Sequence, residues 1–297
     1  MSVEEVECLW DARAELGEGP LWASSLEALL FVDILGARLL QYRPAEGAKR
    51  EWPLDEACCW LIERGDGDGF IAGLRSRIVH LRLDESGPRV VEELARPEAH
   101  LPGNRFNDAK ADPAGRVWAG SMDAAERDAS GALYRLDDRG MVAVDRPYVI
   151  ANGPAFSPDG RTLYHTDTAV RTVYALDCSE QGVLSGKRVH IRFDAQDGFP
   201  DGMTCDAEGG LWVAHFGGSC LSRFHPDGRF DRRVRIPATQ VTSCTFGGAG
   251  FDELYVTTAA RGRDDEPLAG ALFRLRPGVR GLPPNRFGRP DDGRPSP

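Results

Sequence analysis

Four short motifs set polar side chains between glycine, proline and apolar residues, and they are the candidates for chemistry in this sequence. The motifs are Leu16–Pro20, Asn104–Asp108, Ala151–Pro154 and Phe199–Met203. Three of them contribute Glu18, Asn152 and Asp201, which offer oxygen ligands, two of them anionic. Such ligands suit a hard divalent cation whose remaining coordination positions are filled by water. Because burying two carboxylates without a cation is costly, we expect these residues either to bind a metal or to face water.

A repeat of short strands must position these motifs, and it is the strongest structural signal in the sequence. Six turn-plus-strand segments carry an aromatic residue, and successive aromatic residues lie 39, 48, 46, 48 and 43 positions apart. They are Phe31, Phe70, Trp118, Tyr164, Trp212 and Tyr255. Each is followed by a second alternating strand, and steps such as Asp-Gly supply hairpin turns. A period of about 45 residues, repeated six times, predicts an all-β fold, a six-bladed β-propeller with a central channel.

The distance from each polar motif to the next aromatic residue is nearly constant. Roughly 10 to 13 residues separate them, as between Asn107 and Trp118 or between Asp201 and Trp212. In a rotational repeat, equal offsets place residues on one ring, so we expect the polar side chains to meet at the central channel. The alternative for any single motif is a turn, because Asn-Gly and Asp-Gly are hairpin dipeptides and Glu18 could cap a turn. The shared offset favours a common site.

The composition argues against several classes of partner. The chain has 297 residues, with 36 Lys and Arg against 46 Asp and Glu, and its formal net charge is −10. Nucleic acids and anionic membranes attract concentrated positive charge, so neither is expected as the main partner. No apolar run reaches the ~18 residues of a transmembrane helix, and Met1–Glu5 lacks the pattern of a signal peptide. We therefore expect a cytoplasmic protein.

The cysteines and the C-terminal residues complete the expected domain organisation. Seven cysteines occur without a C-x-x-C motif, and Cys58 and Cys59 are adjacent, which is a poor geometry for a disulfide between them. Reduced and mostly buried thiols are expected. Residues 278–297 are rich in proline, glycine and charge, which predicts a disordered tail after a single propeller domain over residues 1–277.

The four motifs, taken in order, resemble the senescence-marker-protein/gluconolactonase/luciferin-regenerating-enzyme-like family. Further pieces of the resemblance are Asp112–Arg116, Ser157–Gly160 and Tyr164–Thr168. The similarity spans about residues 6–285 and looks greatest to the bacterial sugar lactonases, with regucalcin more distant. It implies a six-bladed propeller that binds one divalent metal ion in its channel. By matching motif, the implied metal ligands are Glu18, Asn152 and Asp201, and the implied substrate-binding residues are Arg105 and Asn107.

One loop departs from the family pattern. Some members place an acidic residue soon after a Gly-Thr-Met stretch, where it binds sugar hydroxyls, but here the ungapped match is Ala125. Asp123 and Glu126 are the nearby acids that could substitute for it, so this loop predicts no sugar preference. Cys59 and Trp60 lie on a segment that faces the channel in this family. They either reshape the substrate pocket or pack as ordinary blade residues.

The function that follows is a metal-dependent sugar lactonase, which hydrolyses an aldono-lactone of the gluconolactone, xylonolactone or arabinonolactone type to the aldonic acid. The metal polarises the lactone carbonyl as a Lewis acid, and Asp201 accepts the proton of the attacking water. Arg105 and Asn107 donate hydrogen bonds to the substrate. Oxygen ligands admit Ca²⁺, Mg²⁺, Mn²⁺ and Fe²⁺ and, less naturally, Zn²⁺, so the sequence leaves the ion open.

Two other functions remain open from the sequence. The propeller is alternatively a regucalcin-like regulatory protein that binds a divalent metal without turnover, or an interaction scaffold whose axial polar residues only form turns. Arg105 and Asn107 favour an enzyme, because a protein that only binds metal does not need them. The expected partner is a small-molecule sugar lactone, and the expected state is a monomer or a weak dimer.

Overall fold

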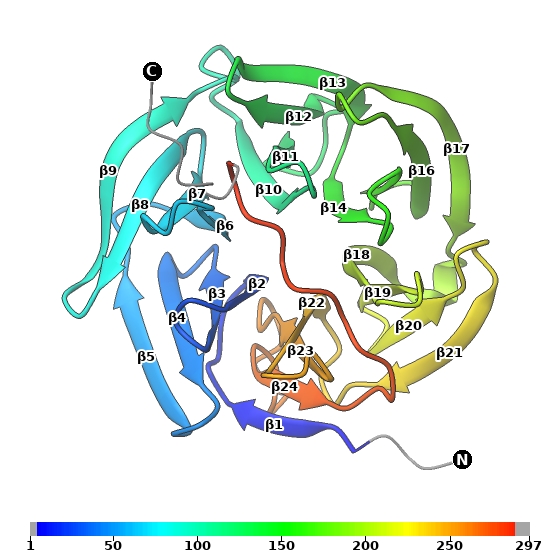
Figure 1. The fold of residues 1–297 in the computed structure, drawn as a ribbon. Helices are drawn as coiled ribbons and strands as arrows, with labels where there is room; N and C mark the ends of the chain where they lie inside the picture. Colours follow the sequence, from blue (N-terminus) through cyan, green and yellow to red (C-terminus); the bar gives the residue numbers. More distant parts are fainter. Residues whose placement is uncertain (1–4, 289–297) are drawn as a thin grey trace.

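The structure, a computed structural model, describes residues 5–288. Its strands form six four-stranded sheets arranged as blades around a central axis (Figure 1). The predicted six-bladed β-propeller is therefore confirmed. Within the described range the helical elements reduce to one 3-10 turn, η1 (Ala195–Asp197). No helix among these residues is long and apolar enough to cross a membrane.

The blades follow one another along the chain. The first two contain β2 (Gly17–Ala23), β3 (Ala28–Asp33), β4 (Arg38–Arg43) and β5 (Ala48–Pro53), then β6 (Cys58–Glu63), β7 (Phe70–Leu74), β8 (Ile78–Asp84) and β9 (Gly87–Ala95). The third and fourth contain β10 (Asn104–Ala111), β11 (Val117–Asp123), β12 (Gly131–Asp137) and β13 (Gly140–Tyr148), then β14 (Ala151–Phe156), β15 (Thr162–Asp167), β16 (Thr172–Cys178) and β17 (Leu184–Arg192). The last two contain β18 (Phe199–Cys205), β19 (Leu211–Phe216), β20 (Cys220–Phe224) and β21 (Phe230–Arg235), then β22 (Val241–Gly247), β23 (Glu253–Thr258), β24 (Leu272–Leu275) and the N-terminal β1 (Glu7–Trp10).

The aromatic residues that defined the repeat occupy equivalent places in the blades. All six lie on the second strand of their blade and are buried: Phe31, Phe70, Trp118, Tyr164, Trp212 and Tyr255. The ring closes because β1 pairs with β24, which sets Glu7 opposite Arg274. A strand from each end of the chain thus completes one sheet.

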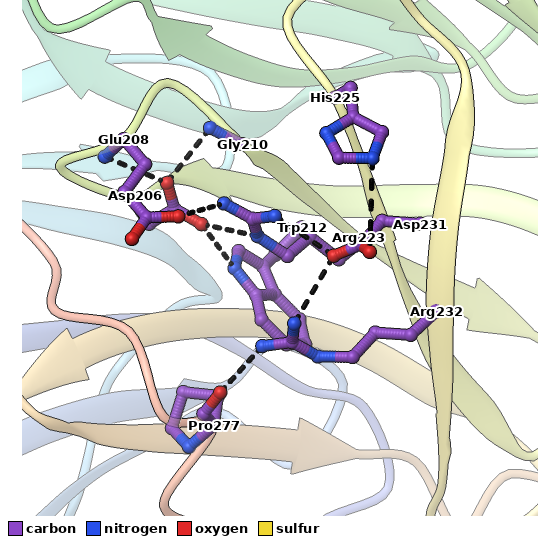
Figure 2. A network of polar contacts seen from close by, with 9 residues as sticks. All are labelled: Asp206, Glu208, Gly210, Trp212, Arg223, His225, Asp231, Arg232 and Pro277. Carbon is purple, nitrogen blue, oxygen red and sulfur yellow. Dashed lines mark hydrogen bonds and ion pairs between the residues drawn. The ribbon is translucent and has the colours of Figure 1, made fainter.

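A buried carboxylate ties the turn of the fifth blade to its aromatic residue. Asp206 accepts hydrogen bonds from Trp212 Nε1 at 2.9 Å and from Arg223 Nε at 2.7 Å (Figure 2). Asp112 accepts the same bond from Trp118 Nε1 in the third blade, also at 2.9 Å. Because both Asp–Trp pairs have the same spacing in the sequence, part of the sequence repeat is a repeat of this interaction.

The C-terminal residues differ from the predicted disordered tail. Residues 278–288 cross the propeller axis from the sixth blade toward β6 and β10 (red in Figure 1). Phe287 N donates to Glu63 O at 2.8 Å, and Gly288 N donates to Gly115 O at 2.9 Å. The composition suggested too little apolar surface for order, but blade backbone groups satisfy the polar groups of this segment. The rest of the predicted tail, residues 289–297, lies outside the described residues.

Gly115→Ala is expected to weaken the contact between this C-terminal segment and the third blade. Gly115 has a φ of +81°, and a Cβ there would lie 2.6 Å from the carbonyl oxygen of Gly288. Gly217 has the same φ, and a Cβ there would meet nothing within 4 Å, so Gly217→Ala is the matched control. We expect the control to lose about 1 kcal/mol of unfolding free energy and Gly115→Ala to lose about 1–2 kcal/mol more. Urea unfolding measures both, and equal losses would show that the contact with Gly288 contributes nothing.

Candidate functional site

The six innermost strands line the axis and contact one another in order around the ring. They are β2, β6, β10, β14, β18 and β22. Each breaks register with the second strand of its blade: between Glu18 and Leu21, Cys58 and Trp60, Phe106 and Ala109, Asn152 and Ala155, Pro200 and Met203, and Val241 and Ser243. A β-bulge leaves residues unpaired and redirects their side chains. The equal offsets in the sequence therefore correspond to one level of six irregular strands.

The three predicted metal ligands lie at this level and are buried. They are Glu18 on β2, Asn152 on β14 and Asp201 on β18. Burial and then the charge of Glu18 raise the pKa of Asp201, and a hydrogen bond from Asn152 lowers it. Asp201 therefore lies close to both of the other predicted ligands. The Asn-Gly and Asp-Gly steps lie inside strands, so the hairpin-turn alternative is wrong for these two motifs.

Burial dominates the electrostatics of the acids at the axis. Burial and then the charge of Asp108 raise the pKa of Glu18 to about 8, against a hydrogen bond from Gly19 N at 3.0 Å that lowers it. Burial and then the charges of Glu18 and Asp108 hold the pKa of Asp201 well above its usual range. Three carboxylates thus repel one another when no cation is bound, and a divalent cation would relieve that repulsion.

The side-chain amide of Asn152 is oriented by its nitrogen, and its oxygen has no hydrogen-bond partner among the described residues. Asn152 Nδ2 donates to Thr168 Oγ1 at 3.0 Å, and Thr168 Oγ1 donates to Pro200 O at 2.8 Å. Asn152 Oδ1 is buried and has no hydrogen-bond partner within residues 5–288. An unpaired buried oxygen is costly, and a bound cation would supply the missing partner. In the same range no group of three His, Cys, Asp or Glu side chains is placed to hold a metal, so the candidate site depends on this amide beside two carboxylates.

The two predicted substrate-binding residues lie at the same site and hold each other in place. Arg105 Nη1 donates to Asn107 Oδ1 at 2.7 Å, and Asn107 Nδ2 donates to Ala151 O at 2.9 Å. Both side chains are buried. The charge of Arg105 lowers the pKa of Glu18 and of Asp201, which places the guanidinium beside the acids. A guanidinium has five N–H donors, so Arg105 keeps donors for a ligand.

Cys59 adjoins Arg105, whereas Trp60 packs within the blades. Burial raises the pKa of the Cys59 thiol to about 11, while the charge and hydrogen bond of Arg105 lower it. The ring of Trp60 meets that of Phe106 edge-on, with ring centroids 6.2 Å apart, and occupies the space over Gly73. Trp60 thus packs within the blades and also lines the channel cavity, while Cys59 borders Arg105.

The two acids of the divergent loop, Asp123 and Glu126, are held in different ways. Asp123 accepts three backbone N–H bonds from its own loop, at 3.1–3.2 Å. Glu126 is exposed and forms an ion pair with Arg261 of the sixth blade at 3.3 Å. The third and sixth blades stand on opposite sides of the ring (Figure 1), so this pair reaches across the axis. Nothing local in the sequence points to Arg261, since its partner is 135 residues away.

A cavity of about 130 Å³ continues the channel beyond the acids. Its lining residues follow the site residues along the inner strands and include Lys110, Thr204 and Thr245, and residues 282–285 of the C-terminal segment close its far end. The charge of Lys110 lowers the pKa of Glu18 and of Asp108. No pattern in the sequence indicates a role for Asp108 or Lys110, which lie two residues apart on β10.

Comparisons with known proteins agree with the motifs. Residues 16–260 match the model of the SMP-30/Gluconolactonase/LRE-like region. The chain is 35% identical to regucalcin of Gallus gallus over 97% of this chain and 99% of that protein, and 37% identical to the pentonolactonase XacC of Haloferax volcanii over 92% and 94%. A solved calcium-binding protein, the regucalcin of Agrobacterium tumefaciens, aligns with a TM-score of 0.89 and 27% identity over 97% of this chain and 100% of that one. The chain therefore belongs to the SMP-30/gluconolactonase/LRE-like family.

Proposed function

We propose that this protein is a metal-dependent sugar lactonase that opens an aldono-lactone to the aldonic acid. The observation that carries the proposal is the meeting of two sets of residues at one level of the axis. One set offers oxygen ligands for a cation, and the other, Arg105 with Asn107, offers fixed hydrogen-bond donors for a carbonyl substrate. The family supports the proposal, since the Haloferax volcanii relative is named a pentonolactonase.

Glu18, Asn152 and Asp201 would hold one divalent cation, which supplies Lewis acidity to the reaction when bound. The unpaired Asn152 Oδ1 and the repulsion between the buried acids support this assignment. So does the description of the Agrobacterium tumefaciens regucalcin as a calcium-binding protein. Oxygen ligands favour Ca²⁺, Mg²⁺, Mn²⁺ or Fe²⁺ over Zn²⁺. Elemental analysis of the purified protein identifies the ion.

Arg105 and Asn107 orient the lactone. Asn107 Oδ1 holds the guanidinium before substrate arrives, so the remaining N–H groups of Arg105 are preorganised to donate to the carbonyl or ring oxygen. One amide hydrogen of Asn107 is donated to Ala151 O, and the other is available to the substrate. Because both side chains are buried, their hydrogen bonds act in a medium of low dielectric constant and are stronger than in water.

Asp201 accepts the proton of the attacking water. As the water oxygen bonds to the carbonyl carbon, the ring C–O bond breaks, and the proton passes to the departing ring oxygen, which becomes a hydroxyl group of the aldonic acid. A carboxylate beside a cation is a weak base, so we expect Asp201 to act more through its position than through basicity.

Metal removal is expected to stop turnover. A pH-indicator assay measures acid release from gluconolactone, xylonolactone and arabinonolactone before and after treatment with a chelator. The chelated protein should release acid at the uncatalysed rate, and addition of Ca²⁺ or Mn²⁺ should restore turnover. Full turnover by protein that elemental analysis shows to be free of metal would contradict the proposal. Cation binding without acid release would favour the regulatory protein without turnover, and neither binding nor release would favour the scaffold.

A further inference from the structure

Asp108 is a buried carboxylate with too few partners. It is 2% exposed, and its Oδ1 accepts a hydrogen bond from Ala109 N at 2.7 Å. Its Oδ2 is also buried and accepts no hydrogen bond from the described residues. Among residues 5–288 the one cation that affects its pKa is Lys110, which acts through its charge and not through a hydrogen bond. Burial raises the pKa of Asp108, so its carboxyl group remains ionised only with water or a cation nearby.

Comparison of the blades shows that the fold does not require a side chain at position 108. In three blades the residue after the predicted metal ligand is glycine, at positions 19, 153 and 202. A Cβ at Gly153 would lie 2.3 Å from Met203 Cε, and one at Gly202 would lie 2.2 Å from Ser243 Oγ, both in the next blade. Asn107 is the equivalent residue of the third blade, and there the next residue carries a carboxylate.

The charge of Asp108 reaches both predicted acidic ligands. It raises the pKa of Glu18 and the pKa of Asp201. Among the described residues, no three Asp, Glu, His or Cys side chains are arranged to bind one metal ion. Glu18, Asp108 and Asp201 are therefore not all direct ligands of the same ion. A carboxylate near an ion but outside bonding distance interacts with it through a water molecule of the coordination shell.

We propose that Asp108 is an outer-sphere residue of the axial ion site: its Oδ2 accepts a hydrogen bond from a water molecule in the coordination shell, and its charge strengthens cation binding. Lys110, which lines the same channel two residues along β10, opposes it with a positive charge. Asp108 is thus a positioning residue that acts on substrate only through the ion and its water. The inference rests on the proposed function, because it needs an ion at Glu18, Asn152 and Asp201.

Asp108→Asn tests this role, because it removes the charge and keeps the shape. Calorimetric titration of the metal-free full chain with CaCl₂ or MnCl₂ is expected to show one ion per chain and an affinity about 10- to 100-fold weaker than in the wild type. Lys110→Met removes the opposing charge and is expected to tighten binding. Asp138→Asn makes the same change of charge at an exposed turn and is expected to leave the affinity unchanged.

Melting temperatures separate a binding role from a structural one. Metal-free Asp108→Asn is expected to melt no lower than the wild type, because it loses an unpaired buried charge, while its rise in Tm with added cation should shrink. Equal affinity in Asp108→Asn and in a wild type that binds the ion would overturn the role of Asp108 and leave the proposed function standing. A wild type that binds none of Ca²⁺, Mg²⁺, Mn²⁺ and Fe²⁺ would overturn both. If Asp108→Asn does not fold, weaker or unchanged binding in Lys110→Met overturns the inference.

Discussion

Asp201→Asn is expected to lower kcat/KM for aldono-lactone hydrolysis by at least about 100-fold, with loss of bound metal. The substitution removes an anionic ligand and the group that accepts the proton from water, because an amide oxygen is a far poorer base than a carboxylate. The fold should survive, since Asn107 and Asn152 occupy the equivalent position in their own blades and are buried there.

The measurement joins acid release with elemental analysis of the same preparation. Asp194→Asn is the matched control, because it makes the same change of charge in the exposed segment that leads to β18. The control should keep its metal and its rate. Full metal content and full turnover in Asp201→Asn would show that Asp201 is neither ligand nor base, and the proposed mechanism would then be wrong.

Asp206→Ala is expected to cause the largest loss of stability, about 3–5 kcal/mol of unfolding free energy. Asp206 is fully buried and accepts bonds from Trp212 Nε1, Arg223 Nε and two backbone N–H groups of its turn (Figure 2). Its removal leaves the buried indole N–H without an acceptor and takes from Arg223 its one fully buried partner. Both effects destabilise only the folded state, so the urea midpoint should fall.

The same arginine provides the control. Glu208 pairs with Arg223 Nη2 at 2.9 Å, but its side chain is 66% exposed, so solvent screens the interaction. Glu208→Ala is therefore expected to cost less than about 1 kcal/mol. Similar losses of stability in the two variants would show that burial of the Asp206 carboxylate does not explain its contribution. The same explanation would then fail for the hydrogen bond between Asp112 and Trp118.

The blades are alike in architecture and unlike at the axis, and the site arises from that difference. Asn107, Asn152 and Asp201 lie at equivalent places in their blades. Asn107 holds Arg105 by a hydrogen bond, whereas Asn152 and Asp201 are candidate metal ligands. The glycine that follows two of them is replaced by Asp108 in the third blade. A scaffold with near-rotational symmetry thus produces a site with one side for the ion and another for the substrate.

The local pattern of the sequence was enough to predict the architecture and the level of the site. Alternating strands, turn residues and the spacing of six aromatic residues repeat about every 45 positions, and a repeat of that kind depends only on contacts within a blade and with the next one. The common offset of Glu18, Asn107, Asn152 and Asp201 placed them on one ring for the same reason.

The tertiary structure decided what crosses the axis. The ion pair of Glu126 with Arg261 and the burial of Asp108 beside Glu18 and Asp201 join blades that lie far apart in the sequence. The path of residues 278–288 is of the same kind, because their composition resembles a tail and only the blade edges supply partners for their backbone. Periodicity describes a repeating unit, whereas these contacts exist only after the ring has closed and brought opposite blades together.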